Sequence, residues 1–295
     1  MRARCPFNAA TANADDVIAR RRCAAEHYFP EFIGRIRARY KVDIEPSTLG
    51  GVPVEIITPA AGVADGNRRR VLINLHSGGF IDGGRWSGQV ESIPIAALGR
   101  FKVVAVDYRL APEYHFPAAS EDVAAVYAAL LKEYRPASIG IYGCSAGAVL
   151  TAEAVAWLQK ERLPRPGAIA MLCGGAFPQD GGDSARLDAA LAGPAAGPAR
   201  IQYFSAADAN NPLAAPGLAP QILAQFPDSL LISGTRDGAL STVLVTHARL
   251  IKAGVKADLH VWEGLGHSFH FDPDLPEARE VSEVVVRFFG EHLHD

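Results

Sequence analysis

The chain has 295 residues, of which 49% are hydrophobic and 21% are charged, and its formal net charge at pH 7 is −3. A chain of this length can bury a large core, and α/β architectures commonly reach it within one domain, so a single domain over residues 1–295 is expected. The near-neutral charge provides no basic surface for a polyanion, which excludes nucleic acid as an expected partner.

Helical and strand patterns follow one another in the first half of the chain. Residues 14–40 mix apolar and charged residues at helical spacing and predict one or two amphipathic helices. Residues 52–59 alternate apolar and polar residues, as a half-exposed strand does. Residues 70–76 and 101–108 are nearly continuous apolar runs, which are typical of buried parallel strands.

Strands and helices continue to alternate in the second half. Residues 137–143 and 167–173 resemble buried strands, and the Ala-rich stretch between them, 146–162, predicts a helix. The later predicted elements are a strand at 228–237, a helix at 242–253, a strand at 256–264 and a closing helix at 275–292. This alternation predicts an α/β fold with a mostly parallel central sheet and helices on both faces.

One segment interrupts this rhythm. Residues 176–220 are rich in proline, glycine and alanine and have no strong period, so we expect an insertion over one face of the sheet. Ligands bind outside the carboxyl ends of the strands in open α/β sheets. An insertion at those ends would therefore act as a substrate lid.

A serine between two glycines is the first candidate for chemistry. The stretch "YGCSAGA" at residues 142–148 fits the pattern GxSxG, the nucleophile elbow of α/β-hydrolases, and Ser145 falls between a predicted strand and a predicted helix, as the elbow requires. Gly143 and Gly147 lack a Cβ atom and let the crowded chains pass. The N–H groups at the start of the following helix favour negative charge near Ser145.

A serine nucleophile needs a histidine that accepts its proton and an acid that orients the histidine. His267 lies in "GLGHSFHF", just after the last predicted strand, and is the candidate base, with His270 as its competitor. Asp237 ends the preceding predicted strand at the same edge of the sheet and is the candidate acid. The chain order Ser145, Asp237, His267 is that of α/β-hydrolases.

The candidate oxyanion hole comes from a glycine-rich loop and from the elbow. The stretch "NLHSGGF" at residues 74–80 follows a predicted inner strand and is similar to the HGGG-type loops that supply backbone N–H groups to the hole. Gly78, Gly79 and Ala146 are the expected donors. Loss of one such donor typically costs about 100- to 1000-fold in rate.

Cysteine usage and the N-terminal segment predict a cytoplasmic location. The four cysteines, Cys5, Cys23, Cys144 and Cys173, lie far apart and lack metal-ligand spacing. We therefore expect free, buried thiols in a reducing compartment and no metal site. The first residues contain no apolar stretch of signal-peptide length, and no run approaches the roughly eighteen apolar residues of a membrane span.

Four segments, in the right order, resemble the hormone-sensitive-lipase family of carboxylesterases, bacterial family IV. They are "HSGGF" at 76–80, "DYRLAPEYHFPAASED" at 107–122, "GCSAGA" at 143–148, and "SGTRD" to "GLGHSFH" at 233–270. The resemblance implies an α/β-hydrolase fold, a Ser, Asp, His triad and no cofactor. It also implies a small helical cap built from residues 1 to about 45 and from residues 176–212.

Three positions depart from the family pattern. After Asp237 the family commonly has proline, leucine and a second acid, whereas "GAL" follows in this chain. Ser77 replaces the first glycine of HGGG, but the two family donor positions correspond to Gly78 and Gly79, so the oxyanion hole is expected to be intact. Cys144 occupies a position where the family often has aspartate or threonine. Since the elbow presents only Ser145, we expect Cys144 to affect packing and not to act as a second nucleophile.

The segment "DYRLAPE" is structural in the family. The resemblance therefore implies that Asp107, Arg109 and Glu113 form a buried polar network that orders the loops. In the same way, His76 is expected to form a hydrogen bond that shapes the oxyanion loop.

The function implied by the resemblance is hydrolysis of short- to medium-chain or small aryl esters through an acyl-enzyme on Ser145. Lactonase, carbamate hydrolysis and amidase or formamidase chemistry would use the same triad and stay as alternatives. A non-catalytic receptor for a small ligand is a further alternative, but receptors of this fold lose the triad histidine, whereas His267 is present. The expected partners are a small ester substrate and, through the last strand and helix, a second copy of the chain.

Overall fold

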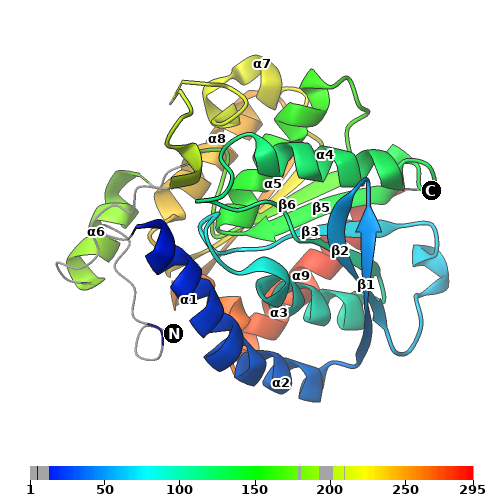
Figure 1. The fold of residues 1–295 in the computed structure, drawn as a ribbon. Helices are drawn as coiled ribbons and strands as arrows, with labels where there is room; N and C mark the ends of the chain where they lie inside the picture. Colours follow the sequence, from blue (N-terminus) through cyan, green and yellow to red (C-terminus); the bar gives the residue numbers. More distant parts are fainter. Residues whose placement is uncertain (1–4, 6–12, 179–180, 193–201, 209, 295) are drawn as a thin grey trace.

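The computed structural model describes residues 5, 13–178, 181–192, 202–208 and 210–294. Within them the chain forms a central sheet with helices on both faces (Figure 1). The strands are β1 (Val42–Leu49), β2 (Val52–Pro59), β3 (Val71–Leu75), β4 (Lys102–Val106), β5 (Ile139–Cys144), β6 (Ala168–Leu172), β7 (Asp228–Arg236) and β8 (Ala257–Gly266). The helices are α1 (Ala14–His27), α2 (Phe29–Arg39), α3 (Gly84–Gly99), α4 (Ala118–Leu130), α5 (Ala146–Lys160), α6 (Gly182–Ala192), α7 (Pro220–Leu223), α8 (Leu240–Lys252) and α9 (Pro276–His292).

The strand order explains where a site can form. The described strands make one eight-stranded sheet in the order β1-β2-β4-β3-β5-β6-β7-β8, in which β2 is antiparallel to both neighbours and the other pairs are parallel. The predicted mostly parallel sheet is therefore confirmed. The strand order reverses at β3, which lies between β4 and β5. In such sheets ligands bind outside the carboxyl ends of the strands at this reversal.

Both faces of the sheet are buried. Alternate side chains of β3 point to opposite sides: Ile73 packs in the core beneath α4 and α5, and Leu72 packs in the core with α3 and α9. Figure 1 shows these two helical layers on opposite sides of the sheet. Burial of one such aliphatic side chain contributes about 1.5–3 kcal/mol, so the central strands form a rigid base for the loops that follow them.

The prediction of a half-exposed strand at residues 52–59 is wrong. Only Pro53 is exposed in β2, because β1 and β4 pair with its two edges and α3 packs against it. Glu55, which produced the alternation in the sequence, is 5% exposed and accepts hydrogen bonds from the Gln89 side chain at 2.8 and 3.0 Å. A buried carboxylate is tolerated there because it also forms an ion pair with Arg85, at 3.1 Å.

The prediction of four free thiols is wrong for one pair. Cys5 and Cys23, which are 18 residues apart, are joined by a disulfide that ties Cys5 to α1. Cys144 and Cys173 are free and buried, as expected. Since disulfides are rare in reducing compartments, cysteine usage no longer supports the cytoplasmic location, which stays a prediction.

Candidate active site

Ser145 occupies the turn between β5 and α5 in a backbone conformation that residues with a Cβ atom seldom adopt. Its φ is 56° and its ψ is −117°. The turn is held by a hydrogen bond from its N–H to the Leu172 carbonyl at 2.8 Å, at the end of the neighbouring strand β6. Strain of this kind persists only where the surroundings fix it, and it clusters at functional sites. The structure thus has the strand, turn and helix that the pattern predicted.

Gly143 and Gly147 lie so close to the last residue of β3 that neither position has room for a side chain. A Cβ atom added at Gly147 would lie 1.8 Å from the Leu75 carbonyl oxygen, and one at Gly143 would lie 2.3 Å from the same atom. Both distances are far below van der Waals contact, and the obstacle is backbone that cannot rotate away. The close approach brings the elbow against the strand whose loop carries the expected oxyanion donors.

This crowding predicts a large loss of stability on substitution of Gly147 and no such loss at Gly34, a helical glycine without close neighbours. We expect Gly147→Ala to lower the free energy of unfolding by about 3 kcal/mol. Gly34 in α2 has nothing within 4 Å of an added Cβ atom, so Gly34→Ala should raise it by about 0.5–1 kcal/mol. Urea unfolding of both variants measures the difference, and equal stabilities would contradict the tight approach to Leu75.

A continuous hydrogen-bonded chain joins three side chains from three strand ends. His267, which follows β8, places Nε2 2.8 Å from Ser145 Oγ and Nδ1 2.7 Å from Asp237 Oδ1. Asp237 follows β7. With Asp237 ionised, Nδ1 carries the imidazole proton and Nε2 is free to accept the proton of the Ser145 hydroxyl. The predicted candidates are thus brought together in the predicted pairing.

Asp237 is held as a carboxylate by its surroundings. Its side chain is buried, and burial alone would raise its pKa; the hydrogen bond from His267 and the electrostatic attraction between the two groups act in the opposite direction. Further hydrogen bonds reach it from the Ala239 N–H at 2.9 Å and the Ser233 hydroxyl at 2.8 Å. Together these contacts lower the pKa of Asp237 to about 2. The acid is therefore ionised throughout the neutral range and fixes the orientation of His267.

The competing histidine lies elsewhere. His270 lies in a 3₁₀ turn at Phe269–Phe271, and both of its ring nitrogens are buried without a hydrogen-bond partner. No hydrogen bond joins it to Ser145 or Asp237, so the geometry favours His267 over His270 as the base.

The loop after β3 has the backbone that a Gly-Gly sequence allows. Gly78 and Gly79 have φ values of 122° and 64°. A Cβ atom at Gly78 would lie 2.0 Å from the Asp82 carbonyl oxygen. Ala146 is the first residue of α5, and within the described part of the chain the N–H groups of Gly78, Gly79 and Ala146 have no recorded backbone acceptor. These donors, which come from the ends of paired strands β3 and β5, are available to an oxyanion.

A buried acid that the sequence analysis missed supports this loop. Glu91 of α3 accepts hydrogen bonds from the Ser77 N–H at 2.8 Å and from the Asn74 side chain at 3.1 Å. Burial raises the pKa of Glu91 to about 8, although these hydrogen bonds act in the opposite direction. The carboxyl is therefore mostly protonated at neutral pH. No signal in the sequence pointed to it, because α3 itself was not predicted.

The raised pKa of Glu91 gives a defined pH dependence. The folded pKa of about 8 exceeds the unfolded value of about 4.3, so this contribution to stability is complete below about pH 4.3 and is lost as the pH rises to about 8. We expect Glu91→Gln to remove this decline. Urea unfolding between pH 5 and 8 measures it, with the exposed Glu45→Gln as control. Parallel profiles for wild type and Glu91→Gln would contradict the assignment.

His76 forms the expected hydrogen bond. Its Nδ1 lies 2.7 Å from the Ser77 carbonyl, and its ring stacks on Tyr108 with 4.0 Å between centroids. Burial lowers the pKa of His76 to about 4, so the ring is neutral and donates from Nδ1 to the carbonyl. This bond fixes the first peptide of the oxyanion loop.

The single buried network expected for "DYRLAPE" is not present. Arg109 is half-exposed and pairs with Asp122 at 2.8 Å, whereas Glu113 pairs with Arg21 of α1 at 2.7 Å. Asp107 takes part in neither ion pair and donates its N–H to a carbonyl of β2. Asp107, Arg109 and Glu113 therefore contact three separate neighbours, and each of them fixes a different part of the surrounding structure.

Helix α1 is tied to the oxyanion loop, a contact that the sequence did not reveal. Arg20 Nε lies 2.8 Å from Asp82 Oδ2, and Arg21 Nε donates to the Ile81 carbonyl at 2.5 Å. The N–H groups of Ile81 and Asp82 in turn donate to the Gly78 carbonyl at 3.1 and 3.0 Å. The spacing of residues 14–40 predicts only that the arginines lie on the polar side of an amphipathic helix, whereas in the structure they fix a loop next to the site.

Residues 72–271 match the model of a family described by its alpha/beta hydrolase fold. The chain belongs to this family. The esterase E25 is similar in structure, with a TM-score of 0.85, 31% sequence identity and coverage of 96% of this chain and 88% of that one. An esterase of the bacterial hormone-sensitive lipase family has a TM-score of 0.82 and 28% identity, over 97% of this chain and 95% of that one. The predicted family resemblance is confirmed.

Proteins that are similar in sequence also have the names of ester hydrolases. An acetyl-hydrolase of Streptomyces hygroscopicus is 29% identical over 252 residues, which are 82% of this chain and 80% of the relative. A versiconal hemiacetal acetate esterase of Emericella nidulans is 36% identical over 39% of this chain and 41% of the relative. The α/β-hydrolase described above is therefore an enzyme that hydrolyses carboxylic esters. Among its described helices, none is both long and apolar enough to cross a membrane.

Proposed function

We propose that the protein is a serine carboxylesterase that hydrolyses short- to medium-chain or small aryl esters through an acyl-enzyme on Ser145. The observation that carries this proposal is the unbroken chain of short hydrogen bonds from Asp237 through His267 to Ser145. The side chain of His267 is 42% exposed, so the proton acceptor is open to a substrate from solvent.

The proposed reaction has two halves. Ser145 Oγ attacks the ester carbonyl while His267 Nε2 takes its proton, and the oxyanion accepts hydrogen bonds from Gly78, Gly79 and Ala146. Collapse of this intermediate breaks the bond to the alcohol, which leaves with the proton from His267. Water then repeats the sequence on the acyl-enzyme and releases the acid.

A cap would set the acyl-chain preference. We propose that α1, α2 and α6 form it, as the family resemblance implies. The expected cap residues 1–4, 6–12, 179–180, 193–201 and 209 lie outside the described part of the chain. Ser184 of α6 donates to the Gly238 carbonyl at 2.8 Å, directly after Asp237. With α1 held against the oxyanion loop, both helical segments contact loops that carry site residues.

Substrate size is tested with p-nitrophenyl acetate, butyrate, octanoate and laurate. The names of the acetyl-hydrolase and acetate-esterase relatives favour small acyl groups, so we expect kcat/KM to be highest for acetate or butyrate and at least about tenfold lower for laurate, a difference of about 1.4 kcal/mol. A maximum at laurate would contradict the proposed substrate class.

Amide hydrolysis is the second candidate, because one relative is an arylacetamide deacetylase of Oryctolagus cuniculus, 34% identical over 41% of this chain and 32% of the relative. The rate on p-nitroacetanilide, compared with p-nitrophenyl acetate, separates the two. A faster rate on the amide would favour a deacetylase. If neither compound reacts but a fluorophosphonate labels Ser145, the substrate is to be sought among lactones and bulky aryl esters.

Association of two copies remains a proposal. Strand β8 is at the edge of the sheet and exposes Val261, so it could pair with β8 of a second copy. Size-exclusion chromatography with light scattering gives the mass in solution, and a mass of about 31.4 kDa would exclude the dimer.

A further inference from the structure

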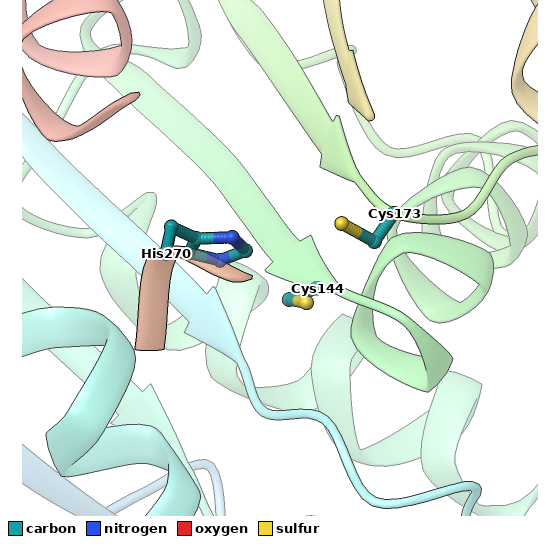
Figure 2. A group of neighbouring side chains, drawn as sticks. All are labelled: Cys144, Cys173 and His270. Carbon is teal, nitrogen blue, oxygen red and sulfur yellow. The ribbon is translucent and has the colours of Figure 1, made fainter. Parts of the chain in front are cut away.

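Two thiols and an imidazole, those of Cys144, Cys173 and His270, lie close together (Figure 2), and Cys144 directly precedes Ser145 in the chain. Cys144 is the last residue of β5, Cys173 directly follows β6, and His270 comes from the 3₁₀ turn after the triad histidine. The Sγ atoms of Cys144 and Cys173 and one ring nitrogen of His270 all lie within 4.8 Å of one another. Neither thiol is needed for the proposed ester hydrolysis, so the cluster has no role in that reaction.

The chemistry of this cluster suits a thiophilic cation. Sulfur and imidazole nitrogen are the ligands of closed zinc sites, at about 2.3 and 2.0 Å from the ion, which places ligand atoms of a tetrahedral ion roughly 3.5–3.8 Å apart. The cluster needs little contraction to reach that spacing. The side chains belong to strand ends and a short turn that the sheet already holds together.

His270 provides the second observation. Both of its ring nitrogens are buried without a hydrogen-bond partner, and a buried polar group left unsatisfied in this way is unfavourable. A cation bound to one nitrogen would give that atom a partner.

We propose that Cys144, Cys173 and His270 form a three-ligand site for a thiophilic divalent cation, with Zn²⁺ as the reference ion. Binding releases the thiol protons that remain on the two cysteines to solvent, and His270 coordinates as the neutral imidazole. The fourth position is left to water. The site is separate from the serine, but it shares a loop with the triad.

The shared loop makes binding inhibitory. Ser268, the residue after His267, donates its N–H to Cys173 Sγ at 3.4 Å, and its hydroxyl lies 3.2 Å from Cys144 Sγ. A cation that takes both sulfurs and His270 removes these contacts and draws the loop away from Ser145. The expected loss of esterase activity rests on the proposed function, whereas binding of the cation does not.

A second group of three candidate metal ligands overlaps with this site and has to be distinguished from it. Cys173, Asp237 and His267 also offer ligand atoms within 4.8 Å of one another, so a cation could instead sit on the triad. Replacement of His270 affects only the proposed site, and replacement of His267 affects only the alternative.

Titration of the full chain with Co²⁺, then with Zn²⁺ as competitor, tests the proposal. We expect one equivalent of Co²⁺ to give thiolate-to-cobalt charge-transfer absorption, which Zn²⁺ removes. His270→Ala should weaken Zn²⁺ binding by more than about 100-fold, the upper range for loss of an outer partner of a metal ligand. Cys144→Ser and Cys173→Ser should lose the absorption, while the control His260→Ala on β8 should keep it.

The outcomes separate binding from catalysis. Ser145→Ala should bind Co²⁺ like wild type, because binding does not depend on turnover. In active protein, Zn²⁺ should inhibit ester hydrolysis by wild type but not by His270→Ala, when each rate is compared with that of the same protein without metal. Thiolate absorption that survives in His270→Ala and is lost in His267→Ala would place the cation on the triad and overturn the proposal. Absence of thiolate absorption in wild type would overturn it as well. If either serine variant fails to fold, His270→Ala and His267→Ala still decide between the sites.

Discussion

Ser145→Ala is expected to lower kcat for p-nitrophenyl acetate by about 10⁵- to 10⁶-fold, with little change in the free energy of unfolding. The hydroxyl supplies the atom that attacks the carbonyl, and its Oγ lies 2.8 Å from His267 Nε2, the proposed proton acceptor. The small residual rate comes from the oxyanion donors and substrate binding. Steady-state kinetics measure the loss, and thermal unfolding confirms that the variant is folded.

Ser47→Ala is the matched control, because Ser47 is an exposed residue of β1 far along the chain from the elbow. It should keep wild-type kcat and KM. A Ser145→Ala protein within tenfold of wild type would mean that another group attacks the ester, and the proposed mechanism would have to be abandoned.

Asp237→Asn is expected to lower kcat by about 10³- to 10⁴-fold and to leave KM nearly unchanged. The carboxylate holds the proton on Nδ1 of His267, whereas the NH₂ group of asparagine can hydrogen-bond to Nδ1 in the opposite sense and place the proton on Nε2. Nε2 then cannot accept the proton of Ser145. A rise in KM with unchanged kcat would indicate that Asp237 serves substrate binding instead.

The same substitution changes stability in acid. The folded pKa of Asp237 is about 2 and its unfolded value is about 3.9, so its contribution to stability is present above about pH 3.9 and is lost as the pH falls to about 2. Asp237→Asn should lack this loss. Urea unfolding between pH 5 and 2.5 compares the two slopes, and equal slopes would contradict the low pKa.

The elements that could be predicted are those with a clear pattern of apolar residues in the sequence. Continuous apolar runs identified β3 to β7, because strands covered on both faces have no polar positions. Helix α3 was missed because Pro94 and several glycines interrupt its pattern, and its polar residues are buried inside. Helix α4 was missed although it is as Ala-rich as α5, which was predicted, so its composition does not explain the omission. Strand β1 contains Pro46 and depends on pairing with β2.

The candidate site could be predicted because each of its residues ends a recognisable strand. Ser145, Asp237 and His267 follow β5, β7 and β8, and parallel strands bring their carboxyl ends to one edge. Contacts across helices could not be predicted. Glu91 and Arg20 reach the oxyanion loop only because α3 and α1 pack with particular faces inward, and the spacing of apolar residues does not show which loop a polar side chain will contact.

Cysteine pairing could not be predicted either. Spacing alone does not identify which cysteines meet, and the structure joins Cys5 to Cys23 while it brings Cys144 close to Cys173 without a bond. The second pair meets because β5 and β6 are neighbours in register, which is a property of the sheet and not of the local sequence.

The most direct measurement is rapid acid quench of the protein during hydrolysis of p-nitrophenyl acetate, followed by mass spectrometry of its peptides. We expect an acetyl group on the peptide that contains Ser145, located on the serine by fragmentation, and formed at the rate of the initial burst of p-nitrophenol. Turnover with no acetyl group on Ser145, or with the acetyl group on Cys144 or His267 instead, would contradict the acyl-enzyme mechanism.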